Sequence, residues 1–240
     1  MRPMDHTTPM SGNLIAPRWW RAGMDHITAA LLTDLPLPQG PVVELGCGDH
    51  PFPLPPQLAS RPKVDLDRRP GRGGSDLGRV RADVHHLPFP SEHFALVLAL
   101  DVLDQQGVSL PDALAEAWRI LLPEGVLLLR VSAYPWLYGP HDVAFGTGQR
   151  FSARKLERAL HASRFRTVRL TYANTLLLPA AVIARMMQRG GLCSVKRASA
   201  LPWLVERGFN ALLCAEAHWL VRRRFLAGLS LYALARKGTS

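Results

Sequence analysis

The chain has 240 residues, of which 48% are hydrophobic and 20% charged. This is an ordinary composition for a globular protein with a sizeable core. It holds 29 lysine and arginine residues against 19 aspartate and glutamate residues, which gives a formal net charge of +10. Such a balance favours anionic partners such as phospholipid headgroups, nucleic acid or an acidic substrate. An arginine-rich genome would produce the same balance without any such partner.

Several classes of protein are excluded by simple features of the chain. The three cysteines share no metal-ligand spacing and form no disulfide framework, which indicates a reducing compartment. The segment Met1–Pro9 has no apolar signal-peptide region, and the longest uncharged run, Leu170–Ala184, is too short for a membrane span and contains Pro179. We therefore expect a cytoplasmic protein, with peripheral membrane contact left open.

The N-terminal part of the chain is predicted to be a tail followed by helix. Residues 1–12 have the character of a frayed tail. From Asn13 to Leu35, apolar residues recur at near-helical spacing, interrupted at Pro17. We interpret this stretch as one or two helices that either cover the mouth of a site or pack plainly on a sheet.

A short glycine motif follows the first predicted strand, residues 42–47. The strand contains the acid Glu44 and leads into Gly46 and Gly48. Because glycine has no Cβ atom, a turn of this kind brings backbone N–H groups close to a ligand. Taken alone, the motif is equally typical of an ordinary strand-to-helix turn, and the proline-rich segment after it allows only a short helix at about 56–60.

The next two predicted strands both end in carboxylates. Strand 63–67 contains Asp65 and Asp67, and strand 80–84 contains Asp83. An acid at the end of the second strand of an α/β sheet is well placed to accept hydrogen bonds from ribose hydroxyls.

The remaining elements alternate between strands and helices. The run 94–100 is continuously apolar, which is typical of a central parallel strand that is buried on both faces. The sequence therefore predicts an α/β, doubly wound, Rossmann-like fold with a seven-stranded, mostly parallel sheet. The other predicted elements are a helix at 111–121, a strand at 126–131, a loop at 134–149, a helix at 152–162, and strands at 165–172 and 229–235.

An insert of roughly 55 residues separates the last two predicted strands, where a short hairpin would suffice. We interpret it as two helices, about 176–189 and 202–224, that are apolar on one side. Their apolar side either extends the core, covers a hydrophobic acceptor or contacts a membrane. We assign residues 1–40 to the tail and helical cover, and 41–240 to one domain with the insert at about 174–226. The basic residues on the other side are Arg185, Arg189, Lys196, Arg197, Arg207, Arg222, Arg223 and Arg224.

Five segments together carry a family resemblance, because each is weak alone but their order and spacing are specific. In this order and spacing the chain resembles the class I S-adenosylmethionine-dependent methyltransferases, and the small type 11 methyltransferases in particular. The resemblance covers about residues 40–172. The segments are Glu44–Gly48, Val64–Asp67, Ala82–Phe89, Phe94–Val97 and Ala115–Gly125.

The resemblance implies that S-adenosyl-L-methionine is the cofactor, and it assigns residues to the parts of that molecule. Asp65 matches the acid that binds the ribose hydroxyls, with Asp67 as the second choice, and Asp83 matches the carboxylate that reads the adenine amino group. The other implied cofactor positions are Glu44, Gly46 and Gly48 at the amino-acid part, Val84 beside the adenine, and Ala99 and Leu100 at the methyl-donor pocket.

The chain departs from the family pattern at several positions. His50-Pro51 replaces the usual third glycine, Ala95 stands where an aspartate is common, and Glu124 stands where a glycine is common. Gln105 falls near a position that is often histidine. These departures leave open a non-catalytic or repurposed member that binds a ligand or acts as a partner subunit.

The reaction itself requires few catalytic groups, since positioning can supply most of the rate of an in-line methyl transfer. We place the candidate catalytic residues at His141 and Asp142, in the loop after the fifth strand. The Asn/Asp-Pro-Pro-aromatic motif of amine methylation is absent after the fourth strand, and no metal-ligand set is evident. We therefore expect a small acceptor, hydrophobic or lipid-linked, and no nucleic acid; a nucleic-acid methyltransferase is supported by the net charge alone.

Overall fold

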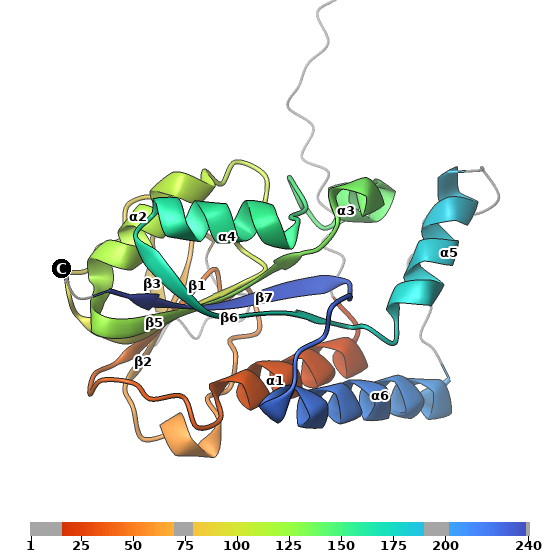
Figure 1. Cartoon of the computed structure of the whole chain (residues 1–240), viewed down its shortest axis with the longest axis horizontal. Coiled ribbons are helices and arrows are strands. Elements are labelled where there is room, and N and C mark those ends of the chain that lie inside the picture. The colour runs from red at the N-terminus through yellow and green to blue at the C-terminus, as the bar shows by residue number, and fades with distance from the viewer. Residues whose placement is uncertain (1–15, 70–78, 190–201, 239–240) are drawn as a thin grey trace, which may run out of the picture.

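A seven-stranded sheet forms the centre of the molecule, in the order β3-β2-β1-β4-β5-β7-β6. In the computed structural model, which describes residues 16–69, 79–189 and 202–238, the first five strands of this order are parallel. Strand β7 is antiparallel to both β5 and β6. The predicted doubly wound, mostly parallel sheet is confirmed, and Figure 1 shows helices on both of its faces.

The elements follow the predicted order, with small shifts at their ends, except that the predicted loop 134–149 contains a 3₁₀ turn and a short helix. The strands are β1 (Val42–Leu45), β2 (Lys63–Asp67), β3 (Arg79–Arg81), β4 (Phe94–Leu100), β5 (Leu121–Ser132), β6 (Phe165–Ala173) and β7 (Ser230–Lys237). The α-helices are α1 (Arg18–Leu32), α2 (Leu110–Ile120), α3 (Pro140–Ala144), α4 (Ala153–Ala162), α5 (Leu178–Arg189) and α6 (Trp203–Arg222), with short 3₁₀ turns at Pro56–Leu58 and Pro135–Leu137.

Two strands differ from their predicted bounds for local reasons. Strand β5 begins at Leu121, immediately after α2, instead of at 126, because Leu121 already pairs with Phe94 before a register shift. Glu124 takes a left-handed backbone conformation (φ 61°) within this irregular start. Strand β3 ends at Arg81, and Asp83 therefore lies in the turn that follows the strand.

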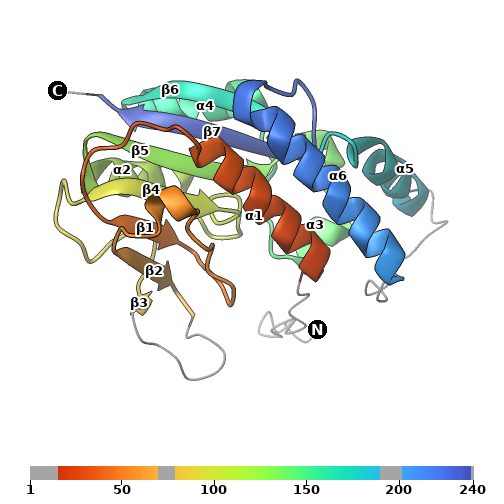
Figure 2. The same cartoon turned by 90° about the horizontal axis from the view of Figure 1, so that it is seen from below.

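Each face of the sheet carries its own apolar core. Helices α2 and α4 pack on one face, and α1 and α6 pack side by side on the other (Figure 2). Helix α1 contributes Met24, Ile27 and Leu31 to the second core, all at most 2% exposed. Of the two interpretations for the N-terminal helix, the structure shows packing on the sheet, and α1 begins just after Pro17.

The predicted insert helices are present, and a buried carboxylate of α6 hydrogen-bonds to the chain just after β6. Glu216, which is 2% exposed, accepts hydrogen bonds of 2.7 Å from the backbone N–H groups of Asn174 and Leu176. These bonds join α6 to the turn between β6 and α5. The basic residues Lys196 and Arg197 lie outside the described residues. Among the described helices, none has the length and hydropathy needed to cross a bilayer.

The contact between α1 and α6 supplies a stability test with an internal control. A Cβ atom on Gly23 would lie 2.6 Å from Cβ of Leu213, whereas one on Gly208 would meet nothing within 4 Å. We expect Gly23→Ala to lower the free energy of unfolding by about 1–3 kcal/mol through overpacking. Gly208→Ala should raise it by about 0.5–1 kcal/mol through helix propensity. Urea denaturation of both variants checks this, and equal effects would contradict the packing.

Candidate functional site

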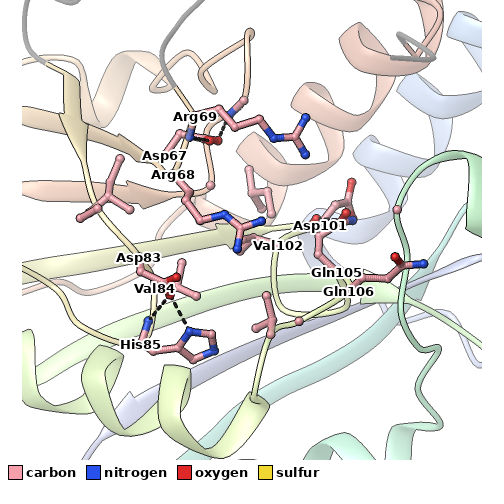
Figure 3. A pocket seen from close by; sticks show the side chains of 18 of the residues that line it. Asp67, Arg68, Arg69, Asp83, Val84, His85, Asp101, Val102, Gln105 and Gln106 are labelled. Carbon is pink, nitrogen blue, oxygen red and sulfur yellow. Dashed lines mark hydrogen bonds and ion pairs between the residues drawn. The ribbon is translucent and has the colours of Figure 1, made fainter. Parts of the chain in front are cut away.

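A cavity of about 560 Å³ opens at the carboxyl ends of the parallel strands (Figure 3). Ligands of α/β sheets bind at this edge, and the volume lies in the range of small-molecule sites. Five of the predicted cofactor residues line it: Gly46, Gly48, Asp83, Val84 and Leu100. Glu44, Asp65 and Ala99 do not line the cavity, and neither do His141 and Asp142.

The glycine turn after β1 forms one wall of this cavity. Gly46 and Gly48 have φ values of 70° and 57°, which a residue with a Cβ atom adopts only at a cost. A Cβ atom on Gly46 would also lie 2.4 Å from Val102, another cavity residue. The glycines are therefore required by the backbone conformation and, at Gly46, by close packing against the loop after β4.

Of the two acids on β2, Asp67 is the one that reaches the cavity. Its Oδ2 atom accepts a 2.8 Å hydrogen bond from the Gly48 N–H, and its Oδ1 atom accepts one of 2.8 Å from the Arg69 N–H. Asp65 instead lies 2.6 Å from the Nζ atom of Lys63. Each oxygen of Asp67 keeps a lone pair for a further donor. The second choice of the sequence analysis thus lies at the cavity, and the first choice does not.

Glu44 supports the turn from behind instead of facing the cavity. It is 3% exposed and accepts 2.8 Å and 2.7 Å hydrogen bonds from the Phe52 N–H and from Lys63 Nζ. Burial raises the pKa of Glu44, while the nearby ammonium of Lys63 opposes this rise. Because Phe52 lies within the proline-rich segment, this carboxylate fixes the path of the chain where a longer helix would otherwise stand.

Asp83 also lines the cavity and is held by His85, which follows the third strand and was a possible site residue from its position in the sequence. The Nδ1 atom of His85 lies 2.5 Å from Oδ1 of Asp83, and the same oxygen accepts a 3.0 Å bond from the His85 N–H. The Nε2 atom of His85 accepts a 2.9 Å bond from the Ser109 N–H, so the network assigns the ring proton to Nδ1. These bonds lower the pKa of Asp83, which keeps it an acceptor at neutral pH.

Three arginines line the cavity near β2 and β3, and the sequence analysis did not single them out as site residues. They are Arg68, Arg69 and Arg79. Arg79 donates to the carbonyl oxygen of Gly48, which helps to hold the glycine turn. Figure 3 shows the Arg68 side chain pointing across the cavity toward the loop after β4. This wall is therefore suited to a ligand that carries a negative charge.

The loop after β4 lines the cavity and is held by a bidentate ion pair between Asp101 and Arg130. Asp101 takes a left-handed conformation (φ 56°), and its two oxygens lie 2.9 Å from Nε and 2.7 Å from Nη2 of Arg130 on β5. This pairing turns the chain so that Leu100 and Val102 face the cavity. Ala99, in contrast, is 1% exposed and belongs to the core.

The two candidate catalytic residues lie on α3, outside the cavity. Asp142 is 1% exposed and already bound: Oδ1 lies 2.7 Å from Arg150, and Oδ2 lies 3.2 Å from Arg185 of α5. The ring of His141 stacks on Phe145, with centroids 4.5 Å apart. Burial, followed by the charge of Arg185, lowers the pKa of His141. Gly146, in the same loop, does line the cavity.

Residues 60–129 match the sequence profile of the type 11 methyltransferase domain family. A search of curated protein sequences found no match. The predicted resemblance to the type 11 class I methyltransferases is confirmed by this match over residues 60–129.

Solved structures establish the same fold over nearly the whole chain. A methyltransferase of Archaeoglobus fulgidus superposes with a TM-score of 0.57 at 11% identity, covering 92% of this chain and 95% of its own. A geranyl diphosphate methyltransferase gives 0.54 at 14% identity, covering 89% and 77%. The cyclase SpnF gives 0.53 at 16% identity, covering 96% and 86%. At these identities the likeness shows the fold alone.

Among the described residues, no group of three potential ligands could hold a metal ion.

A buried acid behind the cavity predicts how stability changes with pH. Asp104 is 1% exposed, and burial, with the charge of Asp101 second, raises its pKa to about 6. The folded state therefore favours the protonated carboxyl, and this contribution is lost as the pH rises through 6. Between pH 4 and 7.5 we expect the stability of the wild type to fall relative to Asp104→Asn by about 2 kcal/mol, mostly below pH 6. Urea unfolding at several pH values checks this, and a constant difference would contradict it.

Proposed function

We propose that this protein binds S-adenosyl-L-methionine in the cavity and transfers its methyl group to a small acceptor. The observation that carries the proposal is the placement of two carboxylates, Asp67 and Asp83, in one cavity with the glycine turn, at the ends of the neighbouring strands β2 and β3. Hydroxyl and amino groups of a nucleoside are donors that such carboxylates accept. The type 11 domain match supports the same cofactor.

The residues of the cavity fit the three parts of the cofactor. Asp83 would accept from the adenine amino group, with Val84 against the ring, and Asp67 would accept from the ribose hydroxyls. The amino-acid part would lie along the turn from Gly46 to Gly48, where the absence of side chains leaves room for it. We therefore move the proposed ribose contact from Asp65 to Asp67 and give Glu44 a supporting role.

The proposed chemistry depends mainly on positioning. When bound, S-adenosyl-L-methionine would supply a methyl group on its sulfonium: a lone pair of the acceptor would bond to the methyl carbon in line with the carbon–sulfur bond, which breaks as S-adenosylhomocysteine leaves. The chain has to hold the acceptor on that line and exclude water. Leu100 and Val102 give the cavity an apolar wall, while Gln105 and Gly146 line it on the side of the loop before α4.

We keep His141 as the proposed general base for an acceptor that must lose a proton. Its lowered pKa leaves the imidazole ring neutral near pH 7, which is the form that accepts a proton. Asp142 is already bound by two guanidinium groups, and we give it a positioning role on α3. Reaching the acceptor requires His141 to lie closer to the cavity than it does in this structure.

For the acceptor we propose a hydrophobic or lipid-linked metabolite. Support comes from the apolar helix α5, which is joined to the α3 loop through the Arg185–Asp142 ion pair. One protein of the same fold is a geranyl diphosphate methyltransferase, so the fold accommodates an apolar acceptor with an anionic group. Arg68 and Arg69 on the cavity wall are suited to such a group.

A second candidate is a ligand-binding or repurposed member without methyl transfer. Two observations favour it: His50-Pro51 replaces a glycine of the first motif, and SpnF, of the same fold, is a cyclase. The two candidates differ in product. Incubation with cofactor labelled in its methyl group, over a panel of apolar acceptors, gives a labelled product only in the first.

The cofactor assignment is tested by two matched acid variants on the same strand. We expect Asp67→Asn to weaken the affinity for S-adenosylhomocysteine at least tenfold, because the charged acceptor for the ribose hydroxyls is lost. Asp65→Asn should change it less than threefold, since Asp65 lies off the cavity. Calorimetric titration measures both. A loss confined to Asp65→Asn would return the ribose contact to Asp65, and no binding by folded wild type would contradict the proposed function.

A further inference from the structure

We infer that α5 and the first turn of α6 form a surface that inserts into the interface of an anionic lipid membrane. This membrane-docking surface consists of Ile183, Met186, Met187, Trp203, Leu204 and Val205, which are between 39% and 67% exposed. Figures 1 and 2 place α5 and the N-terminal part of α6 at the same end of the molecule, beyond the carboxyl ends of the parallel strands. The inference concerns a surface outside the cofactor cavity.

Helix α5 is amphipathic, but its apolar side faces outward. Among the side chains of α5 that the structure describes, from 178 to 188, the exposed ones are all apolar and include Ile183, Met186 and Met187. The polar side chains in this range are half-buried: Arg185 lies 3.2 Å from Asp142 and donates a 3.2 Å hydrogen bond to Gln188. A surface helix in water normally shows the opposite arrangement. The sequence analysis left open whether the apolar side packs inward, and for α5 the exposed fractions show that much of it does not.

The first turn of α6 projects from the molecule. Trp203, Leu204 and Val205 are 63%, 64% and 40% exposed, although successive residues of a helix point about 100° apart. A helix end that is exposed in three directions stands clear of its neighbours. Such a projection can enter a soft lipid interface, whereas a second protein would need a matching hollow. Tryptophan is also a residue type favoured at the membrane–water boundary.

The charge around this surface is complementary to anionic lipid. Arg207 lies beside Trp203, with its guanidinium 5.6 Å from the ring centroid, and Arg18 is exposed at the start of the neighbouring α1. Of the two carboxylates on α5 and α6, Glu216 is buried and Glu206, in the first turn of α6, is half-buried. An apolar surface whose exposed charged neighbours, Arg18 and Arg207, are basic is the pattern of helices that lie in membrane interfaces.

Docking would bring the membrane close to the cavity. Helix α5 is tied to α3 by the ion pair between Arg185 and Asp142, and Gly146, at the end of the same loop, lines the cavity. The cavity and the docking surface both lie at the carboxyl-end side of the sheet. A lipid-linked acceptor held in the membrane would thus approach the edge at which the cavity opens.

Flotation of the full chain with lipid vesicles, without cofactor, tests the inference. We expect co-flotation with vesicles of phosphatidylglycerol and phosphatidylcholine in equal parts, and at least tenfold less with pure phosphatidylcholine. Raising the salt to 0.5 M should reduce the binding, because the basic residues are then screened. Since no cofactor is present, the outcome is independent of the proposed methyl transfer.

Variants with a matched control locate the surface. Ile183→Asp combined with Met186→Asp should abolish flotation, because two carboxylates would have to enter the lipid interface. The control combines Ala115→Asp on α2 with Ala162→Asp on α4, two exposed positions on the other face of the sheet, and should float as the wild type does. Circular dichroism and thermal unfolding establish that both double variants are folded.

Three outcomes would overturn the inference. The first is no flotation of the wild type with anionic vesicles. The second is flotation of the Ile183→Asp, Met186→Asp variant at the level of the control. The third is a wild-type dimer in analytical ultracentrifugation that this variant, but not the control, converts to monomer, because the surface would then be covered by a second copy.

Discussion

The site depends on how closely the turn after β1 approaches the neighbouring strands. The N–H groups of Gly46 and Cys47 both donate to the carbonyl oxygen of Leu66, and the N–H of Gly48 donates to the Asp67 carboxylate. On its other side, Gly46 leaves no room for a Cβ atom against Val102. This approach brings the ends of β1, β2 and β4 around one cavity. The same bonds place Asp67 at the wall, so the fold and the binding chemistry share one set of contacts.

Much of the fold could be predicted because burial leaves a direct mark on the sequence. The run from Phe94 to Leu100 is apolar throughout, since its strand lies in the centre of the sheet with helices on both faces. The glycine turn and Asp83 were found because their positions follow from strand ends. Residues 1–40 as a separate cover, and the exact extent of the insert, stay predictions.

The site was predicted less completely, because the decisive contacts join residues that are far apart in the sequence. Asp65 and Asp67 share one face of β2, and only the contact of Lys63 with Asp65 and the contact of Gly48 with Asp67 separate them. His85 is oriented toward Asp83 by a hydrogen bond from the Ser109 N–H, which lies 24 residues away in the sequence. Likewise, periodicity shows that a helix has an apolar stripe but not which way it faces, and α5 is the case where the stripe faces outward.

The chain has two structural parts, the sheet with α1, α2 and α4, and the α5–α6 insert. The fold that this chain has in common with proteins below 20% identity places a cavity at the strand ends. The α5–α6 insert adds a largely apolar exposed surface beyond that end of the sheet. Asp142 connects the two parts, because it binds Arg150 beside β5 and Arg185 on α5.

The most direct test of the central claim is a crystal structure of the protein with S-adenosylhomocysteine. The account predicts density for the nucleoside between Asp67 and Asp83, with the amino-acid part along the Gly46–Gly48 turn. Ligand density elsewhere, or an empty cavity in crystals grown at millimolar ligand, would contradict it.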